Sequence, residues 1–142
     1  MSADGVALAA IVILLFPMGY FFLASPAFLL VKLDIPPVTQ LLRGMFSIHF
    51  LMTAVAGVIG TVVFAVTGRL AFAIGIALIT AFAIWSRRWF LREWDVQLGA
   101  RDAGDPDAVR RLRRLHWGGM LSNAVQLFAI VGSIPYVATT AA

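Results

Sequence analysis

The sequence predicts an all-α fold, a polytopic membrane four-helix bundle, and three observations indicate it. Of the 142 residues, 61% are hydrophobic and only 13% are charged, whereas a soluble domain carries about 25% charged residues. Long stretches of the chain contain no formal charge, and the basic residues gather in alternate connections between these stretches. The length predicts one domain, residues 1–142.

Four apolar stretches predict four membrane spans, because a helix needs about 20 residues to cross the hydrocarbon core. Residues 5–31 and 44–68 provide 27 and 25 uncharged residues. Residues 70–86 provide only 17 uncharged residues. The span can still be long enough, because tryptophans are favoured at the membrane–water interface and the following arginines can extend their charged ends to it. The last stretch starts at Leu115. We therefore predict spans at about 6–31, 44–67, 70–90 and 115–138.

The first span contains Pro17 and Pro26. Each removes a backbone donor, so we expect a kink and an early helix end there, tolerated where neighbouring helices cover the freed carbonyls. The segment also lacks the basic region and the short apolar run of a secretory signal, so we expect it to be retained in the mature protein.

Basic residues predict the orientation, because short basic connections stay in the cytoplasm. Only Arg69 lies on the opposite side from the others. Both termini are therefore expected outside, in the periplasm for a protein of a bacterial inner membrane. The ten residues expected inside are Lys32, Arg43, Arg87, Arg88, Arg92, Arg101, Arg110, Arg111, Arg113 and Arg114.

The long basic connection predicts cytoplasmic helical extensions over about 87–98 and 106–114. Gly99 and Gly104 are expected to break the first extension. Asp105, Pro106 and Asp107 are typical of a helix start, with an acidic cap, a proline in the first turn and negative charge near the positive end of the helix dipole.

A cluster of arginines opens the fourth helix. Such a cluster can bind anionic lipid headgroups or an acidic partner protein, and it can equally serve only to fix the topology. The residues concerned are Arg110, Arg111, Arg113 and Arg114.

Two stripes of small and polar residues predict close helix packing inside the bundle. In membranes, small residues let helix backbones approach, and polar side chains bond across helices. The simplest arrangement brings the two stripes together. On the second helix the stripe contains His49, Thr53, Gly57 and Gly60, and on the fourth it contains His116, Gly119, Asn123 and Gln126.

His49 and His116 form the one paired constellation suited to a haem iron or a metal ion, since neutral imidazoles are common ligands. Both lie near the cytoplasmic ends of their spans, at depths that differ by roughly 6 Å. The alternative is that each ring hydrogen-bonds to a neighbouring carbonyl or amide. Two histidines without a carboxylate supply fewer ligands than a catalytic zinc site takes.

Several functional classes are excluded by composition. The chain has no cysteine, which excludes disulfides and thiolate metal sites. The apolar spans contain no acidic residue or lysine, which excludes carboxylate proton relays and Schiff-base chemistry. The net charge of +4 reflects arginines beside membrane spans, so we expect no nucleic-acid partner and a binding or structural protein in preference to an enzyme.

The segment Arg113-Arg114-Leu115-His116, followed by Asn123 and Leu127, resembles an RLH…N…L pattern of small four-helix membrane proteins. These are grouped with copper-resistance protein D and the HemJ-type protoporphyrinogen oxidases. The resemblance implies an inner-membrane bundle that handles haem or copper, with Arg114, His116 and Asn123 as the matching positions. The first helix lacks the histidine characteristic of the HemJ type, so the resemblance does not extend to oxidase activity.

Three functions are consistent with these observations. The first is binding of haem or copper near the cytoplasmic face through His49 and His116. The second is an accessory or structural subunit of a larger membrane complex, in contact with other membrane proteins or further copies of itself. The third is an oligomeric small-solute channel or transporter, ranked last because the spans carry no charge and 142 residues leave little room for inverted repeats.

Overall fold

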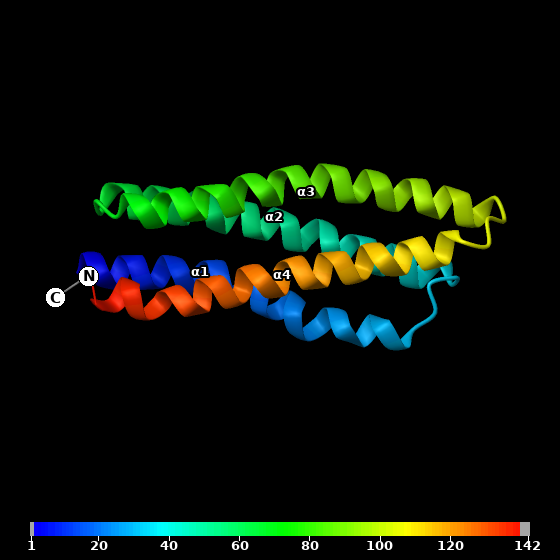
Figure 1. Ribbon diagram of the computed structural model, residues 1–142, viewed down its shortest axis with the longest axis horizontal. Helices are drawn as coiled ribbons and strands as arrows, with labels where there is room; N and C mark the ends of the chain where they lie inside the picture. Colours follow the sequence, from blue (N-terminus) through cyan, green and yellow to red (C-terminus); the bar gives the residue numbers. More distant parts are fainter. Residues whose placement is uncertain (1, 140–142) are drawn as a thin grey trace.

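The computed structural model describes residues 2–139, and it confirms an all-α four-helix bundle (Figure 1). No strand occurs within these residues. The elements in chain order are α1 (Ala3–Ala24), the 3-10 helix η1 (Ser25–Leu30), α2 (Pro36–Val66), α3 (Leu70–Asp102) and α4 (Ala108–Thr139).

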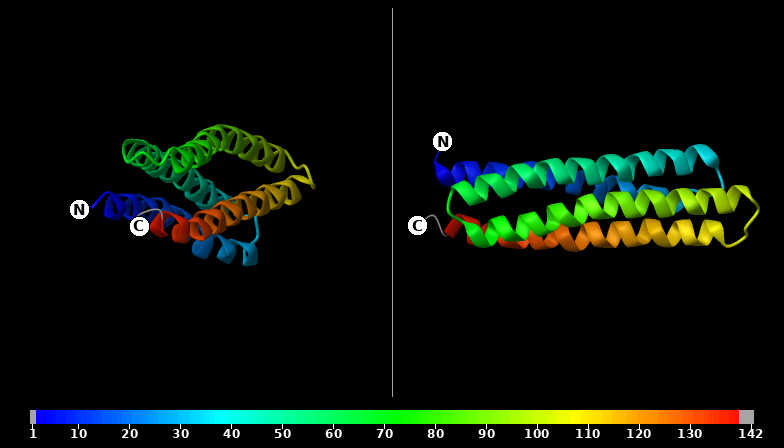
Figure 2. Two further views of the ribbon diagram at one scale, coloured as in Figure 1. Left: turned by 60° about the vertical axis from the view of Figure 1, so that its left-hand side comes forward. Right: turned by 90° about the horizontal axis from the view of Figure 1, so that it is seen from above.

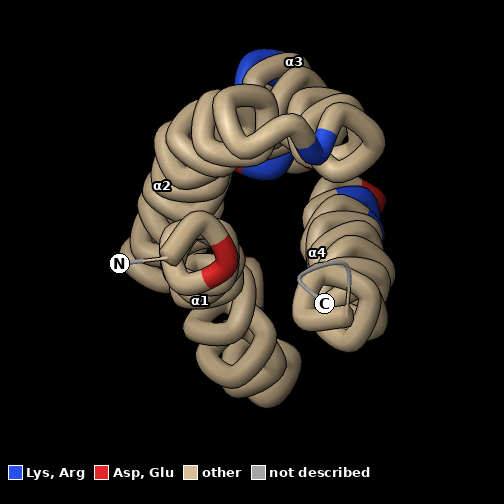
Figure 3. The backbone as a smooth tube through the Cα atoms, turned by 90° about the vertical axis from the view of Figure 1, so that its left-hand side faces the viewer, with Lys and Arg blue, Asp and Glu red and all other residues tan. Residues whose placement is uncertain are grey.

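The helices form a ring in which each packs against its two neighbours. α1 packs on α2 and α4, and α3 packs on the same two helices; Figure 3 shows this order along the bundle axis. The start of α1 and the end of α4 lie at the same end of the bundle (Figure 1). All four helices are long and apolar enough to cross a bilayer, so the chain is a multi-pass membrane protein.

α2, α3 and α4 are longer than a bilayer requires. They contain 31, 33 and 32 residues, or about 46 to 50 Å at 1.5 Å per residue, against roughly 30 Å of hydrocarbon. The arginines concentrate at the end of the bundle that holds the α3 to α4 connection, and Figure 2 shows that connection extending at this end. The excess length therefore lies at the basic end.

The first span ends early, as its prolines predict. α1 continues through Pro17 and stops at Ala24, and η1 then begins at Ser25 with Pro26 in its first turn. In Figures 1 and 2, η1 lies to one side of the bundle at its basic end. This leaves η1 dependent on α4 for its anchoring, as described below.

The interior is divided into an aliphatic half and an aromatic half. Near the termini, small and aliphatic side chains such as Ala7, Leu14 and Ile130 form one cluster. Toward the basic end, Phe21, Phe46, Phe90, Trp94 and other buried side chains form a second cluster. The aromatic half surrounds both histidines, since Phe21 contacts His49 and Phe46 contacts His116.

Glycines bring α2 close to α3. A Cβ atom at Gly57 would lie 2.0 Å from Thr80 Oγ1 and 3.1 Å from Thr80 Cβ, and one at Gly60 would lie 3.3 Å from Ile76. These distances leave no room for a side chain at Gly57. The small residues of α2 therefore serve its packing on α3.

The connection between α3 and α4 differs in one detail from the sequence prediction. The predicted break at Gly99 is wrong, because α3 continues through it to Asp102. The turn comes at Gly104, whose φ of +88° favours glycine. Asp105 Oδ1 then accepts the Asp107 N–H at 2.9 Å. This bond and the Arg111 guanidinium hold the pKa of the Asp105 carboxyl below its usual value.

Both ends of the bundle are closed by arginines. At the basic end, Arg43 forms a bidentate pair with Asp95 at 2.6 and 2.7 Å, which joins α2 to α3. At the other end, Arg69 pairs with Asp4 and donates to the Val137 carbonyl at 2.9 Å. Arg69 thus connects the α2 to α3 turn with both α1 and α4.

Candidate functional site

His116 and Asn123 of the RLH…N pattern, together with the adjacent Arg113, fasten α4 to α1 and to η1. Arg113 donates to the carbonyls of Phe28 and Val31 at 2.7 and 2.5 Å. Asn123 Nδ2 donates to the Met18 carbonyl at 3.0 Å. Both side chains supply donors to backbone carbonyls at positions where α1 or η1 borders α4. Arg113, His116 and Asn123 therefore form a latch between α4 and the segment of α1 and η1, whereas Arg114, the arginine that matches the pattern, makes none of these bonds.

His116 is the central member of this latch and is fully buried. Its Nε2 lies 2.9 Å from Ser25 Oγ and 3.2 Å from the Ser25 carbonyl oxygen. Its Nδ1 lies 3.4 Å from an Arg113 guanidinium nitrogen. Both ring nitrogens thus face groups of the protein itself, and His116 joins α4 to the start of η1.

His49 has a different environment. Its ring is 8% exposed and stacks on Phe21 with the centroids 4.2 Å apart. Its Nδ1 is buried and has no hydrogen-bond partner in the described part of the chain. The ring also interacts with the backbone of Pro17. A ligating histidine commonly donates its second N–H to a backbone carbonyl, and His49 lies beside such a carbonyl.

The two histidines belong to one aromatic chain without touching as a pair. Phe21 stacks on His49, the Phe21 and Phe46 centroids are 4.8 Å apart, and the Phe46 and His116 rings form a T-shaped pair with centroids 6.0 Å apart. In the described residues no direct ring contact joins the two imidazoles. The two histidines therefore have different neighbours: His49 stacks on Phe21, whereas His116 contacts Ser25 and Arg113.

A groove of about 720 Å³ lies between α1, η1 and α2, and His49 lines it. Small-molecule sites usually have volumes of about 300 to 1,000 Å³ and mainly apolar walls with a few polar groups. Aromatic side chains including Phe16, Phe21 and Phe28 form much of the wall, while His49, Gln40 and Tyr20 supply polar atoms. His116 does not line it.

Two thioethers share the groove with His49. Met45 and Met52 lie four residues before and three residues after it on α2, a spacing that places all three on one helix face. Among residues 2–139, no group of three or more His, Cys, Asp or Glu is arranged to hold a metal ion. Within the described chain, His49 therefore shares the groove with two methionine sulfurs and with no second histidine, cysteine or carboxylate.

The other predicted packing residues are distributed over several interfaces. Gly119 packs against Phe46 of α2, three residues before His49, and an added Cβ there would lie 2.3 Å from the Phe46 ring. Gln126 bonds within α4 to Ser122. Thr53 is buried, and its hydroxyl has no partner among the described residues, as is true of Asn123 Oδ1.

The predicted arginine cluster separates into individual roles. Arg110 pairs with Asp107 at 2.6 Å, and Arg111 bonds to Gln97 and Asp105 at 2.6 and 2.5 Å. Arg113 holds η1, as described above. Arg114 is exposed and makes no hydrogen bond or ion pair with another residue in the range 2–139.

The groove itself was missed by sequence reasoning, although one signal for it was present. The Met45, His49 and Met52 spacing is visible in the sequence, but the hollow beside it depends on how α1 and η1 diverge. No protein-family model, curated protein or solved structure matches this chain.

Proposed function

We propose that this integral membrane protein binds haem in the groove between α1, η1 and α2, where His49 would hold the iron. One observation carries the proposal: a buried imidazole with an unpartnered Nδ1 lines a groove large enough for an organic cofactor. Bound haem would supply a redox-active iron whose properties depend on its axial ligand and on the polarity of the pocket.

The remaining residues of the groove fit an amphipathic ligand. Aromatic and aliphatic walls suit the apolar face of a macrocycle, while Gln40, near the start of α2, would receive a polar edge at the cytoplasmic end. His116 is excluded from the proposed ligand set because Ser25 and Arg113 occupy its two nitrogens. The proposal therefore assigns binding to His49 and anchoring of η1 to His116.

The test is a haem titration of the full chain in detergent, followed by visible absorbance. We expect His49→Gln to weaken haem binding by more than about tenfold, as loss of metal-site interactions typically does, while its helical circular dichroism is retained. The matched control is His116→Gln, the substitution of the only other histidine. Equal haem binding by wild type and His49→Gln would disprove the proposal.

Copper(I) is the second candidate, favoured by the thioethers of Met45 and Met52 beside His49. Soft sulfur ligands select this ion. A competition titration with a copper(I) chelator separates the candidates, because Met45→Leu with Met52→Leu should weaken copper binding and leave haem binding unchanged. A preparation that takes up neither ligand would favour the alternative of an accessory subunit. Purification in mild detergent tests that alternative by showing whether other protein chains co-purify with this one.

The orientation forms part of the proposal. Ten basic residues lie toward one end and Arg69 toward the other, so we expect both termini in the periplasm of an inner-membrane protein. A C-terminal alkaline phosphatase fusion should be active, and a green fluorescent protein fusion at the same position should be dark. The reverse pair of results would place the groove at the opposite face of the membrane.

A further inference from the structure

Two hollows follow the seam between α3 and α4, away from the groove that contains His49. The upper hollow, of about 340 Å³, is lined by Trp89 and Glu93 of α3 and by Arg114 and Gly118 of α4, among others. The lower hollow, of about 460 Å³, is lined by residues such as Phe82 and Val125. On each helix these residues recur at spacings of three or four, so both hollows lie over one face of α3 and one face of α4.

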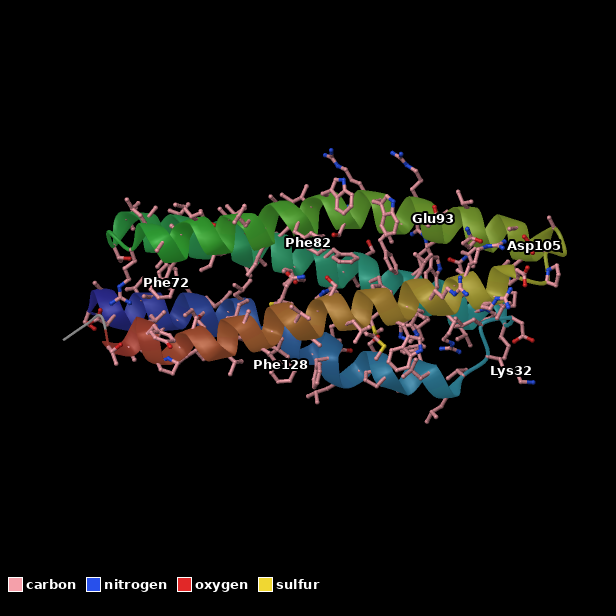
Figure 4. The ribbon with its side chains drawn as sticks, in the orientation of Figure 1. Lys32, Phe72, Phe82, Glu93, Asp105 and Phe128 are labelled. Carbon is pink, nitrogen blue, oxygen red and sulfur yellow. The ribbon has the colours of Figure 1, made fainter. Side chains whose placement is uncertain are left out.

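The two hollows lie at different depths in the membrane. Trp85 and Trp89 stack with centroids 6.0 Å apart, and tryptophans gather at the level of lipid headgroups. The upper hollow includes Trp89 and therefore lies at that level. Val125 is eleven residues beyond Arg114, about 16 Å deeper along α4. Figure 4 shows Glu93 near the basic end of α3 and Phe82 nearer its middle.

One guanidinium at the upper hollow is available to bind an anion. Arg111 lines it but is engaged by Gln97 and Asp105. Glu93 accepts a hydrogen bond from Gln97 Nε2 at 2.8 Å and contributes one negative charge. Arg114 remains as a guanidinium without a partner in the described chain. A free guanidinium at headgroup depth can bind phosphate oxygens with two parallel hydrogen bonds.

We propose that this seam is a binding site for an anionic phospholipid, with the phosphate on Arg114 and an acyl chain in the lower hollow. A ligand that fills both hollows must carry a negative charge at the headgroup level and an apolar chain about 16 Å deeper. Anionic phospholipids of the bilayer have this arrangement. The site involves α3 and α4, so it stands independently of the proposed haem groove.

Native mass spectrometry of the full chain in detergent tests the proposal. The probes are phosphatidylglycerol and phosphatidylcholine with identical acyl chains. We expect wild type to retain about fivefold more phosphatidylglycerol, and Arg114→Gln to lose that preference, since one arginine near a headgroup has about this effect. The control is Arg92→Gln, which removes an equal charge from an exposed position outside both hollows.

A second variant tests the hollow without changing charge. A Cβ at Gly118 would meet no atom within 4 Å, so Gly118→Leu should fold and fill the upper hollow. We expect it to lower lipid retention, whereas Gly99→Leu, equally open but outside the seam, should not. Three results would overturn the proposal: equal retention of the two lipids, equal losses in Arg114→Gln and Arg92→Gln, or a lipid-free dimer that Gly118→Leu abolishes.

Discussion

Gly119→Ala is expected to destabilise the protein by about 1 to 3 kcal/mol, the usual cost of forcing an extra methyl group into a packed core. The new Cβ would lie 2.3 and 2.8 Å from two carbon atoms of the Phe46 ring. Phe46 is fully buried and contacts the rings of Phe21, Phe90 and Trp94. The ring therefore has no free direction in which to move.

The adjacent glycine supplies the control. Gly118→Ala introduces the same methyl group into open space, and alanine is favoured over glycine in a helix by up to about 1 kcal/mol. Chemical or thermal unfolding in detergent should therefore show opposite signs for the two variants. If both were stabilised to the same extent, α4 would not pack on Phe46 as described.

His116→Ala should cost about 3 kcal/mol, because it removes a fully buried side chain and its polar contacts together. Ser25 Oγ would lose its imidazole partner, and the contact with Arg113 would also disappear. The loss should be localised, since these contacts hold η1 to α4. Amide hydrogen exchange is expected to accelerate over residues 25–31 before it does so elsewhere.

A double-mutant cycle with Ser25→Ala separates the latch from a general loss of packing. Ser25→Ala should cost little more in the His116→Ala background, because groups in direct contact are not additive. Additive losses in the unfolding free energy would mean that His116 acts through something other than Ser25. The His49→Gln variant serves as a further comparison, because its side chain makes no contact with this serine in the described structure.

The helices could be predicted from the sequence because membrane spans depend on length and apolarity alone. Uncharged runs such as residues 5–31 have no alternative to crossing the bilayer as helices. The early end of α1 was likewise predictable, since Pro26 cannot continue an α-helix with regular bonds. Gly99 shows the limit of such local rules, because packing along α3 outweighs the modest helix penalty of one glycine.

The candidate site was less accessible to sequence reasoning. His49 and His116 could be selected as intramembrane polar residues, but their individual surroundings depend on the lateral position of η1. Ser25, which borders His116, lies 91 residues away in the chain and carries no distinguishing pattern. The small and polar residues of α2 and α4 were predicted to face each other. In the structure, Gly57 and Gly60 of α2 face α3 instead, and Asn123 of α4 faces α1.

The position of Arg69, at the end of the bundle opposite the other basic residues, has a consequence for biogenesis. In the proposed orientation, Arg69 must cross the membrane as a cation, in the turn between α2 and α3. Asp4 precedes it in translation and can already be on the far side, whereas the Val137 carbonyl arrives only with the last helix. If the amino-terminal segment is exported first, the Asp4 carboxylate is already present to pair with the Arg69 guanidinium when it crosses. The Val137 carbonyl then adds its hydrogen bond when α4 inserts.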